Sequence, residues 1–178
     1  MFIIQTVKAM NTQVAYSYDC DFLDEYVVND FRFDRSIAEP VLDKLDLILR
    51  ECDKYQVCGS YRRGKSTIKD LDIVVMCDDF YKLTKGIDCL WHGRTKTSFV
   101  IDGMQVDFRR ATEETWVTMV LYFTGSREEN IRLRSIAKRR GWKLNEYGLW
   151  NGDKRIPCDS EQAVYAALGL RYREPKNR

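Results

Sequence analysis

The sequence predicts an α+β fold, in which a small mixed sheet is backed by helices and followed by a basic helical end. Two observations carry this expectation: short β-branched segments that alternate with turn signals, and amphipathic stretches with helix caps. A third is the change of charge along the chain. Residues 1–53 hold five Lys/Arg against eleven Asp/Glu, a net of −6, whereas residues 127–178 hold thirteen against seven, a net of +6. The basic end is therefore the candidate phosphate-binding surface.

Length and composition exclude several classes of protein. With 178 residues and 44% hydrophobic composition, the chain can bury one sizeable core or two small abutting lobes. The opening stretch, residues 1–10, has too few consecutive apolar residues for a signal sequence or a membrane span. The six cysteines form no Cys-x-x-Cys pair, and His92 is the single histidine, so a zinc site is not expected. We expect buried free thiols, a reducing intracellular compartment and no membrane association.

The first elements are an N-terminal segment and a helix. Residues 1–33 alternate aromatic and acidic residues without a clear period, which suggests a short strand plus irregular cover. Ser36 followed by Glu39 forms a capping-box pattern and predicts a helix that runs to about Asp53. Its apolar positions keep one face: Ile37, Val41, Leu42, Leu45, Ile48, Leu49 and Cys52.

Strands and further helices follow. Extended segments are predicted over residues 55–58 and 71–76, and Asp102-Gly103 is the signature of a type I′ hairpin between residues 99–101 and 104–108. Helices are predicted at about 113–122, 127–140 and 161–168. The caps and stops that bound them are Thr112, Ser126, Ser160, Gly141 and Gly169.

Three aspartates are the candidate catalytic and metal-binding residues. Asp70 and Asp72 are two apart in a strand, so their carboxylates leave the same face, and Asp107 shares its face with Gln105 and Arg109. If the two strands are neighbours, three carboxylates converge, and hard oxygen ligands of this kind select Mg²⁺ or Mn²⁺. A metal pair roughly 3.5–4 Å apart would serve phosphoryl transfer. The alternative is that these acids are solvated strand charges and that Asp107 pairs with Arg109.

The segment just before the aspartates favours the catalytic interpretation. A strand ends at Gly59-Ser60, where a glycine lets the backbone approach a ligand closely. The turn that follows offers N–H groups and the Ser60 hydroxyl to phosphate oxygens, and Arg63 offers a guanidinium fork. A triphosphate cradle is thus predicted within ten residues of the metal-binding pair.

These residues resemble the family X DNA polymerases, which belong to the nucleotidyltransferase superfamily. The resemblance covers about residues 35–178. It rests on motifs that occur in the family's order: Gly59-Ser60-Tyr61-Arg62-Arg63-Gly64, Asp70-Leu71-Asp72, Val106-Asp107-Phe108-Arg109, Tyr122-Phe123-Thr124-Gly125-Ser126, Asn130 to Arg134, Asn145-Glu146-Tyr147-Gly148-Leu149 and a tail from Ala167 to Pro175. With so few residues before it, the chain resembles the reduced forms of palm and thumb alone known from some large DNA viruses, without a lyase domain.

The resemblance implies a domain division and a set of roles. The palm would be residues 1–111 and the thumb residues 112–178. The palm would hold two Mg²⁺ ions, which Mn²⁺ could replace. Nucleotide-binding positions would be Gly59, Ser60, Arg63, Tyr122, Phe123, Gly125 and Asn130. DNA-binding positions would be Arg134, Lys138, Arg139, Arg140 and Lys143. Residues supporting the aspartates would be Arg109, Glu146 and Tyr147.

The activity that follows is DNA-directed DNA synthesis, in which a primer 3′-hydroxyl attacks the α-phosphate of a dNTP, and short gaps in DNA are the expected substrate. The expected partners are gapped or primer–template DNA and dNTP, bound by a monomer. One alternative is a template-independent or small-molecule nucleotidyltransferase. A second is a non-catalytic module that binds DNA ends, which the intact acid triad opposes.

Overall fold

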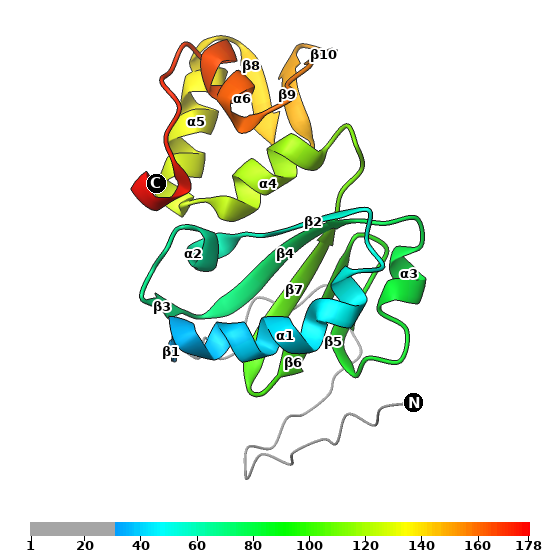
Figure 1. Ribbon diagram of the computed structural model, residues 1–178. Helices are drawn as coiled ribbons and strands as arrows, with labels where there is room; N and C mark the ends of the chain where they lie inside the picture. The colour runs from blue at the N-terminus through cyan, green and yellow to red at the C-terminus, as the bar shows by residue number, and fades with distance from the viewer. Residues whose placement is uncertain (1–30) are drawn as a thin grey trace, which may run out of the picture. The chain divides into compact units, whose positions relative to one another are not determined.

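The structure, a computed structural model, describes residues 31–178 (Figure 1). The predicted strand and cover over residues 1–33 therefore fall almost entirely outside the described residues. The described helices are α1 (Ala38–Leu49), α2 (Gly59–Arg62), α3 (Phe80–Leu83), α4 (Trp116–Thr124), α5 (Arg127–Arg139) and α6 (Glu161–Ala167), with 3₁₀ turns at Arg35–Ile37 and Pro175–Asn177. The strands are β1 (Phe33–Asp34), β2 (Lys54–Val57), β3 (Thr67–Ile68), β4 (Asp70–Met76), β5 (Cys89–His92), β6 (Lys96–Ile101), β7 (Met104–Arg110), β8 (Trp142–Asn145), β9 (Gly148–Asn151) and β10 (Lys154–Ile156).

A five-stranded sheet forms the centre of the first part of the fold. Its strand order is β2-β4-β7-β6-β5, with β4 and β7 parallel and the other neighbours antiparallel. The sheet is thus mixed, as the sequence predicts. Strands β1 and β3 pair separately as a short antiparallel ribbon.

One face of this sheet is apolar and packs against α1, which lies across it in Figure 1. The predicted alternation is confirmed, because every second side chain of β4 and β7 lies in this core. These buried residues are Leu71, Ile73, Val75, Met104, Val106 and Phe108. The opposite face is left to the aspartates and, further along β4, to Val74, which packs under α4 with Met119 and Val120.

The start of the first helix differs from the expected capping box. The Asp34 carboxylate accepts hydrogen bonds from the Ser36 amide (2.9 Å) and hydroxyl (2.6 Å), which fixes a 3₁₀ turn ahead of α1. Glu39 does not return to the helix start; its carboxylate accepts from the Tyr61 hydroxyl at 2.7 Å. Helix α1 therefore begins at Ala38 without a side-chain cap and ends at Leu49, four residues before the expected Asp53.

The other local signals are mostly confirmed. Asp102 and Gly103 have φ of 51° and 81°, the positive pair that a type I′ turn between β6 and β7 requires. The hydroxyls of Ser126 and Ser160 accept from backbone amides and cap α5 and α6. Thr112 is not the residue that starts α4, which begins at Trp116 after a turn closed by Thr115.

The C-terminal part is not purely helical, contrary to the expectation. Strands β8, β9 and β10 form a three-stranded antiparallel sheet whose inner face packs with α5 and α6 around a second core. That core consists of Leu121, Leu133, Ala137, Leu144, Leu149, Val164, Tyr165 and Leu168. The strands were missed because each has only three or four residues, too few for a period-2 pattern.

A buried ion pair joins the two parts. Arg62 of α2 donates to both carboxylate oxygens of Glu161 on α6 (3.1 and 2.7 Å) and to the Thr124 hydroxyl (2.6 Å). The guanidinium of Arg178, whose side chain is fully buried, contacts the same carboxylate at 2.9 Å. Two hydrogen-bonded arginines around one buried carboxylate hold α6 against the turn that follows β2.

Two expectations about chemistry can also be checked in the described part of the chain. The five cysteines there are free thiols: Cys52, Cys58, Cys77, Cys89 and Cys158. None of the helices in residues 31–178 has the length and apolar character needed to cross a membrane.

Candidate active site

The parallel strand pair brings the predicted aspartates together. Asp72 on β4 lies opposite Asp107 on β7, and Asp70 lies opposite Gln105. Paired residues of neighbouring strands point to the same face, so three carboxylates share a small area on the polar side of the sheet. The condition set by the sequence, that the two strands be neighbours, is met.

Gly59, which precedes the aspartates in the sequence, leaves the space that the Asp72 carboxylate occupies. Gly59 has φ +58°, and a Cβ there would lie 2.8 Å from Oδ2 of Asp72. Its place is therefore fixed by the Asp72 carboxylate as well as by any ligand that approaches the turn. From Gly59 the chain enters the short helix α2, which carries Ser60 beside the aspartates.

Asp107 is held by neighbours on its own sheet. Its carboxylate accepts from the Gln105 amide (2.9 Å) and pairs with Lys96 (3.3 Å) and Arg109 (3.4 Å). Within residues 31–178, no three acidic, histidine or cysteine side chains are gathered as they would be around one ion. The backbone thus supplies the three carboxylates to one face, while the Asp107 side chain is turned toward two cations.

The electrostatics of the three acids differ. Burial, together with the charges of Asp70 and Asp107, raises the pKa of Asp72 to about 7. Burial and the Asp107 charge also raise the pKa of Asp70. For Asp107, burial is outweighed by the hydrogen bond from Gln105 and by the charges of Lys96 and Arg109, so its pKa is lowered. The site therefore carries negative charge that the protein only partly compensates.

A cleft of about 530 Å³ opens over Asp70 and Asp72, and Asp107 is not among the residues that line it. All the nucleotide-binding positions expected from the sequence line it: Gly59, Ser60, Arg63, Tyr122, Phe123, Gly125 and Asn130. Asp70 and Asp72, and the expected DNA-binding residue Arg134, line it as well. Three lining residues were missed, namely Arg32, Lys69 and Arg127. Each is a basic residue outside any recognisable motif, so only its position in the fold assigns it to the cleft. The excess of cations over the two lining aspartates suits a polyphosphate.

Two of the arginines that line the cleft, Arg63 and Arg32, are held by hydrogen bonds to backbone carbonyls. The Arg63 guanidinium donates to the Thr124 carbonyl at 2.5 Å. It passes so close to Gly125 that a Cβ there would lie 3.1 Å from Nη1. Arg32 donates to the hydroxyl (3.0 Å) and carbonyl (2.8 Å) of Thr67. Both guanidinium groups are thereby held at the wall of the cleft.

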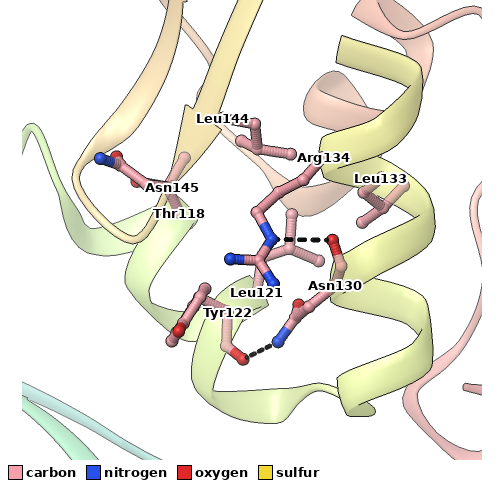
Figure 2. Close-up of a pocket in the computed structure, with 8 residues that line it drawn as sticks. All are labelled: Thr118, Leu121, Tyr122, Asn130, Leu133, Arg134, Leu144 and Asn145. Carbon is pink, nitrogen blue, oxygen red and sulfur yellow. Dashed lines mark hydrogen bonds between the residues drawn. The ribbon is translucent and has the colours of Figure 1, made fainter. Parts of the chain in front are cut away.

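The predicted contacts to the nascent base pair border a second, smaller pocket (Figure 2). The Asn130 amide donates to the Tyr122 carbonyl at 2.7 Å, and Arg134 donates back to the Asn130 carbonyl at 3.3 Å. The Arg134 guanidinium also lies 6.0 Å from the centre of the Tyr122 ring. Asn130 and Arg134 thus share one helix face, as their spacing predicts, and both face Tyr122.

The basic residues after Arg134 differ in their surroundings. Lys138 and Arg139 are exposed at the end of α5. Arg140 donates to the Ala167 carbonyl at 2.7 Å and lies 5.6 Å from the ring of Trp142, so it also supports the packing of α6. Lys143 is exposed on β8.

The three residues expected to support the aspartates do not lie together. Arg109 contacts Asp107 and lies 4.8 Å from the ring centre of Phe123. Glu146 and Tyr147 form the turn between β8 and β9, where the Glu146 carbonyl accepts from the Thr118 hydroxyl at 3.0 Å.

Comparison with known proteins matches both parts of the chain. A family model described as DNA polymerase beta palm matches residues 35–137, and one described as DNA polymerase beta thumb matches residues 119–178. The first alone covers more than half of the chain. The two models overlap in the region of α4 and α5, which lines the cleft.

Relatives include DNA polymerase/3′-5′ exonuclease PolX of Bacillus subtilis, 35% identical over 139 residues that span 70% of this chain and 24% of that protein. Repair DNA polymerase X of African swine fever virus is 30% identical over 137 residues, 67% of this chain and 78% of that protein. DNA polymerase lambda of Rattus norvegicus is 25% identical over 159 residues, 68% of this chain and 28% of that protein. The chain thus spans about a quarter of the bacterial and rat proteins and most of the viral one. It belongs to the family X DNA polymerases, with a palm and a thumb of the polymerase beta type.

Proposed function

We propose that this chain is a template-directed DNA polymerase that transfers dNMP from a dNTP to a primer 3′-hydroxyl and fills short gaps during DNA repair. The observation that carries the proposal is the register of β4 and β7, which sets Asp72 opposite Asp107 with Asp70 two residues away. Family membership and the names of the relatives, two of which are called polymerase X or PolX, support the reaction class.

The donor set fits a pair of divalent cations. Asp70, Asp72 and Asp107 supply only carboxylate oxygens, which are the ligands that Mg²⁺ prefers, with Mn²⁺ able to replace it. When bound, two Mg²⁺ ions would activate the 3′-hydroxyl and neutralise charge on the phosphates. To share an ion with the other two acids, the Asp107 carboxylate would turn away from Lys96 and Arg109 toward Asp72, its neighbour across the strand pair.

The residues of the cleft divide the remaining work. Ser60, Arg63 and the amides at the start of α2 would hold the triphosphate, while Tyr122, Phe123 and Gly125 would contact the sugar. A bulky aromatic pair there would leave little room for a 2′-hydroxyl and would favour deoxynucleotides. Arg134 and Asn130 would read the nascent base pair, and Lys138, Arg139, Arg140 and Lys143 would contact the DNA backbone.

We place the division between palm and thumb at residues 111 and 112. Strand β7 ends at Arg110, and the next residue, Ala111, packs against Met119 and Val120 of α4. The thumb thus begins where the chain leaves the last central strand. We infer a monomer, because residues of this chain alone line the cleft. We further propose that it acts inside the cell, where the DNA substrate of a polymerase is found.

A primer-extension assay tests the proposal. DNA with a one-nucleotide gap, the same primer on an open template and the primer alone would each be incubated with one labelled dNTP and Mg²⁺. Templated addition of the complementary nucleotide, most efficient at the gap and abolished by EDTA, is the expected result. Addition to the single strand at an equal rate would instead indicate a template-independent enzyme. DNA binding without any addition would indicate an end-binding module.

A further inference from the structure

The outer face of the thumb sheet carries a tryptophan between two cations. Lys143 on β8 lies opposite Trp150 on β9, which lies opposite Arg155 on β10. The three side chains therefore form one row across the sheet. The Lys143 Nζ lies 5.9 Å and the Arg155 Cζ 5.8 Å from the Trp150 ring. The alternate residues Leu144 and Leu149 are buried in the core, so this row belongs to the other face.

The indole is placed on the sheet by a glycine. A Cβ on Gly148 would lie 2.7 Å from the Trp150 ring, which therefore covers a position of β9 that has no side chain. Trp150 remains partly exposed, and Lys143 is exposed. Arg155 is anchored from the other side, because its guanidinium bonds to the carboxylate (3.1 Å) and the backbone carbonyl of Glu114. An aromatic surface with a fixed cation beside it results.

One residue on this face of β8 borders the pocket of the nascent pair. Tyr122, Asn130 and Arg134 line both the cleft and the smaller pocket of Figure 2, and Asn145 of β8 lines the pocket with them. Asn145 pairs with Gly148, and Lys143 is two residues further along the same strand, roughly 7 Å at the rise of a β-strand. Lys143 and Asn145 therefore share one face of β8, and Asn145 links the row to the residues around Arg134.

We propose that the row formed by Lys143, Trp150 and Arg155 binds the unpaired template strand beyond the nascent base pair, with one base stacked on Trp150. Aromatic stacking suits this role because every base offers a π-face, so any template sequence is accepted. The two cations would lie near the flanking phosphates. The inference rests on the proposed template-directed function and adds a site for single-stranded DNA to it.

Equilibrium binding in EDTA and without dNTP tests the site separately from catalysis. Fluorescence anisotropy would compare two primer–template duplexes, one blunt and one with a 5′ template overhang of four nucleotides. We expect the overhang to tighten binding by at least about fivefold, the lower end for stacking of one base. In Trp150→Leu, which keeps an apolar cover over Gly148, the overhang should add nothing, while the blunt duplex should bind as before. Trp150→Phe should retain most of the gain.

A charge variant and its control complete the test. Lys143→Gln should reduce the gain from the overhang, whereas Lys154→Gln, at an exposed lysine on the opposite face of the same sheet, should leave it intact. Lys143 is exposed, so its variant answers the question even if the tryptophan variants fail to fold. An overhang without effect on the wild type, or equal losses for blunt and overhanging DNA in Trp150→Leu, would overturn the inference. Failure of primer extension with a normal overhang effect would contradict the proposed reaction and not this site.

Discussion

Asp72 and Asp107 lie opposite one another in the parallel strand pair at the centre of the five-stranded sheet. Through this pair, two strands whose aspartates are 35 residues apart in sequence contribute to one site. Each aspartate reaches it by strand alternation, and Gly59 leaves room for the Asp72 carboxylate. Because the aspartates lie on two different strands, the contribution of each can be measured by replacing it alone.

Asp107→Asn should lower turnover by several orders of magnitude and leave DNA affinity roughly unchanged, because it removes one carboxylate from the proposed metal site. Single-turnover insertion and anisotropy measure the two quantities. Asp102→Asn is a matched control, because Asp102 lies in the turn of the same hairpin and Asn tolerates its φ of 51°. EDTA should stop the wild-type reaction, and added Mg²⁺ should restore it. Turnover of Asp107→Asn above a tenth of the wild-type value would remove Asp107 from the site.

Arg32→Ala should weaken dNTP binding about tenfold, the low end for a charge-assisted hydrogen bond, because Arg32 is exposed at the cleft wall. The effect should appear in KM for dNTP and not in the affinity for gapped DNA. Arg50→Ala, which removes an exposed arginine at the end of α1, should change neither quantity. An Arg32→Ala enzyme with a normal KM would show that the guanidinium only anchors Thr67.

Glu129 should make the stability of the thumb depend on acid pH. Burial would raise its pKa, but hydrogen bonds from Arg132, Tyr165 and Arg173 outweigh burial and lower the pKa to about 2. A depressed pKa stabilises the fold above the unfolded value of 4.5, and this contribution is lost as the pH falls toward 2. Glu129→Gln should therefore cost about 3 kcal/mol at neutral pH, and less in acid.

Urea unfolding at pH 7, 4 and 2.5 measures the effect. Glu128→Gln is the control, since Glu128 is the neighbouring glutamate on α5 and is exposed. A difference between Glu129→Gln and the wild type that stays constant over this pH range would contradict the assigned role of the carboxylate.

The placement of the three aspartates could be predicted from the sequence more fully than the fold of the thumb, for physical reasons. Asp70, Asp72 and the Asp102-Gly103 turn follow local rules of strand alternation and turn conformation, so their placement could be expected without a structure. Arg32 reaches the cleft only because β1 pairs with β3, a long-range contact that no local pattern encodes. The β8–β10 sheet consists of strands too short to show a period, and its row of Lys143, Trp150 and Arg155 exists only once the strands are in register.

The capping box at Ser36 illustrates a different failure. Its pattern is genuine, but two closer partners compete for the same groups: Asp34 accepts from Ser36, and Tyr61 donates to Glu39. The capping box was therefore displaced by one local contact, between Asp34 and Ser36, and by one tertiary contact, between Tyr61 of α2 and Glu39 of α1.

The exposed basic residues at the end of α5 should contribute to DNA affinity without sequence preference. Replacing Lys138 and Arg139 together by Gln should weaken binding alike for all sequences and flatten the dependence of log K on log salt by up to about two units. Arg140 is unsuitable for this test, because its hydrogen bond to Ala167 makes it part of the thumb structure. Anisotropy at several salt concentrations measures the slope, and an unchanged slope would place the DNA on another face.

Arg134 should act on insertion more than on affinity. It lies one helical turn beyond Asn130, lines the cleft and faces the Tyr122 ring, so it is placed at the nascent pair and away from the exposed end of α5. Arg134→Ala should therefore slow insertion of the matched dNTP by a larger factor than it weakens binding of gapped DNA, and should narrow the difference between matched and mismatched dNTPs. Single-turnover rates beside duplex affinity measure both. Since Arg134 also bonds to Asn130, Asn130→Ala separates the two residues: if Arg134 acts only by holding Asn130, the two variants should lose insertion equally and the double variant should lose no more. A further loss in the double variant is the result we expect.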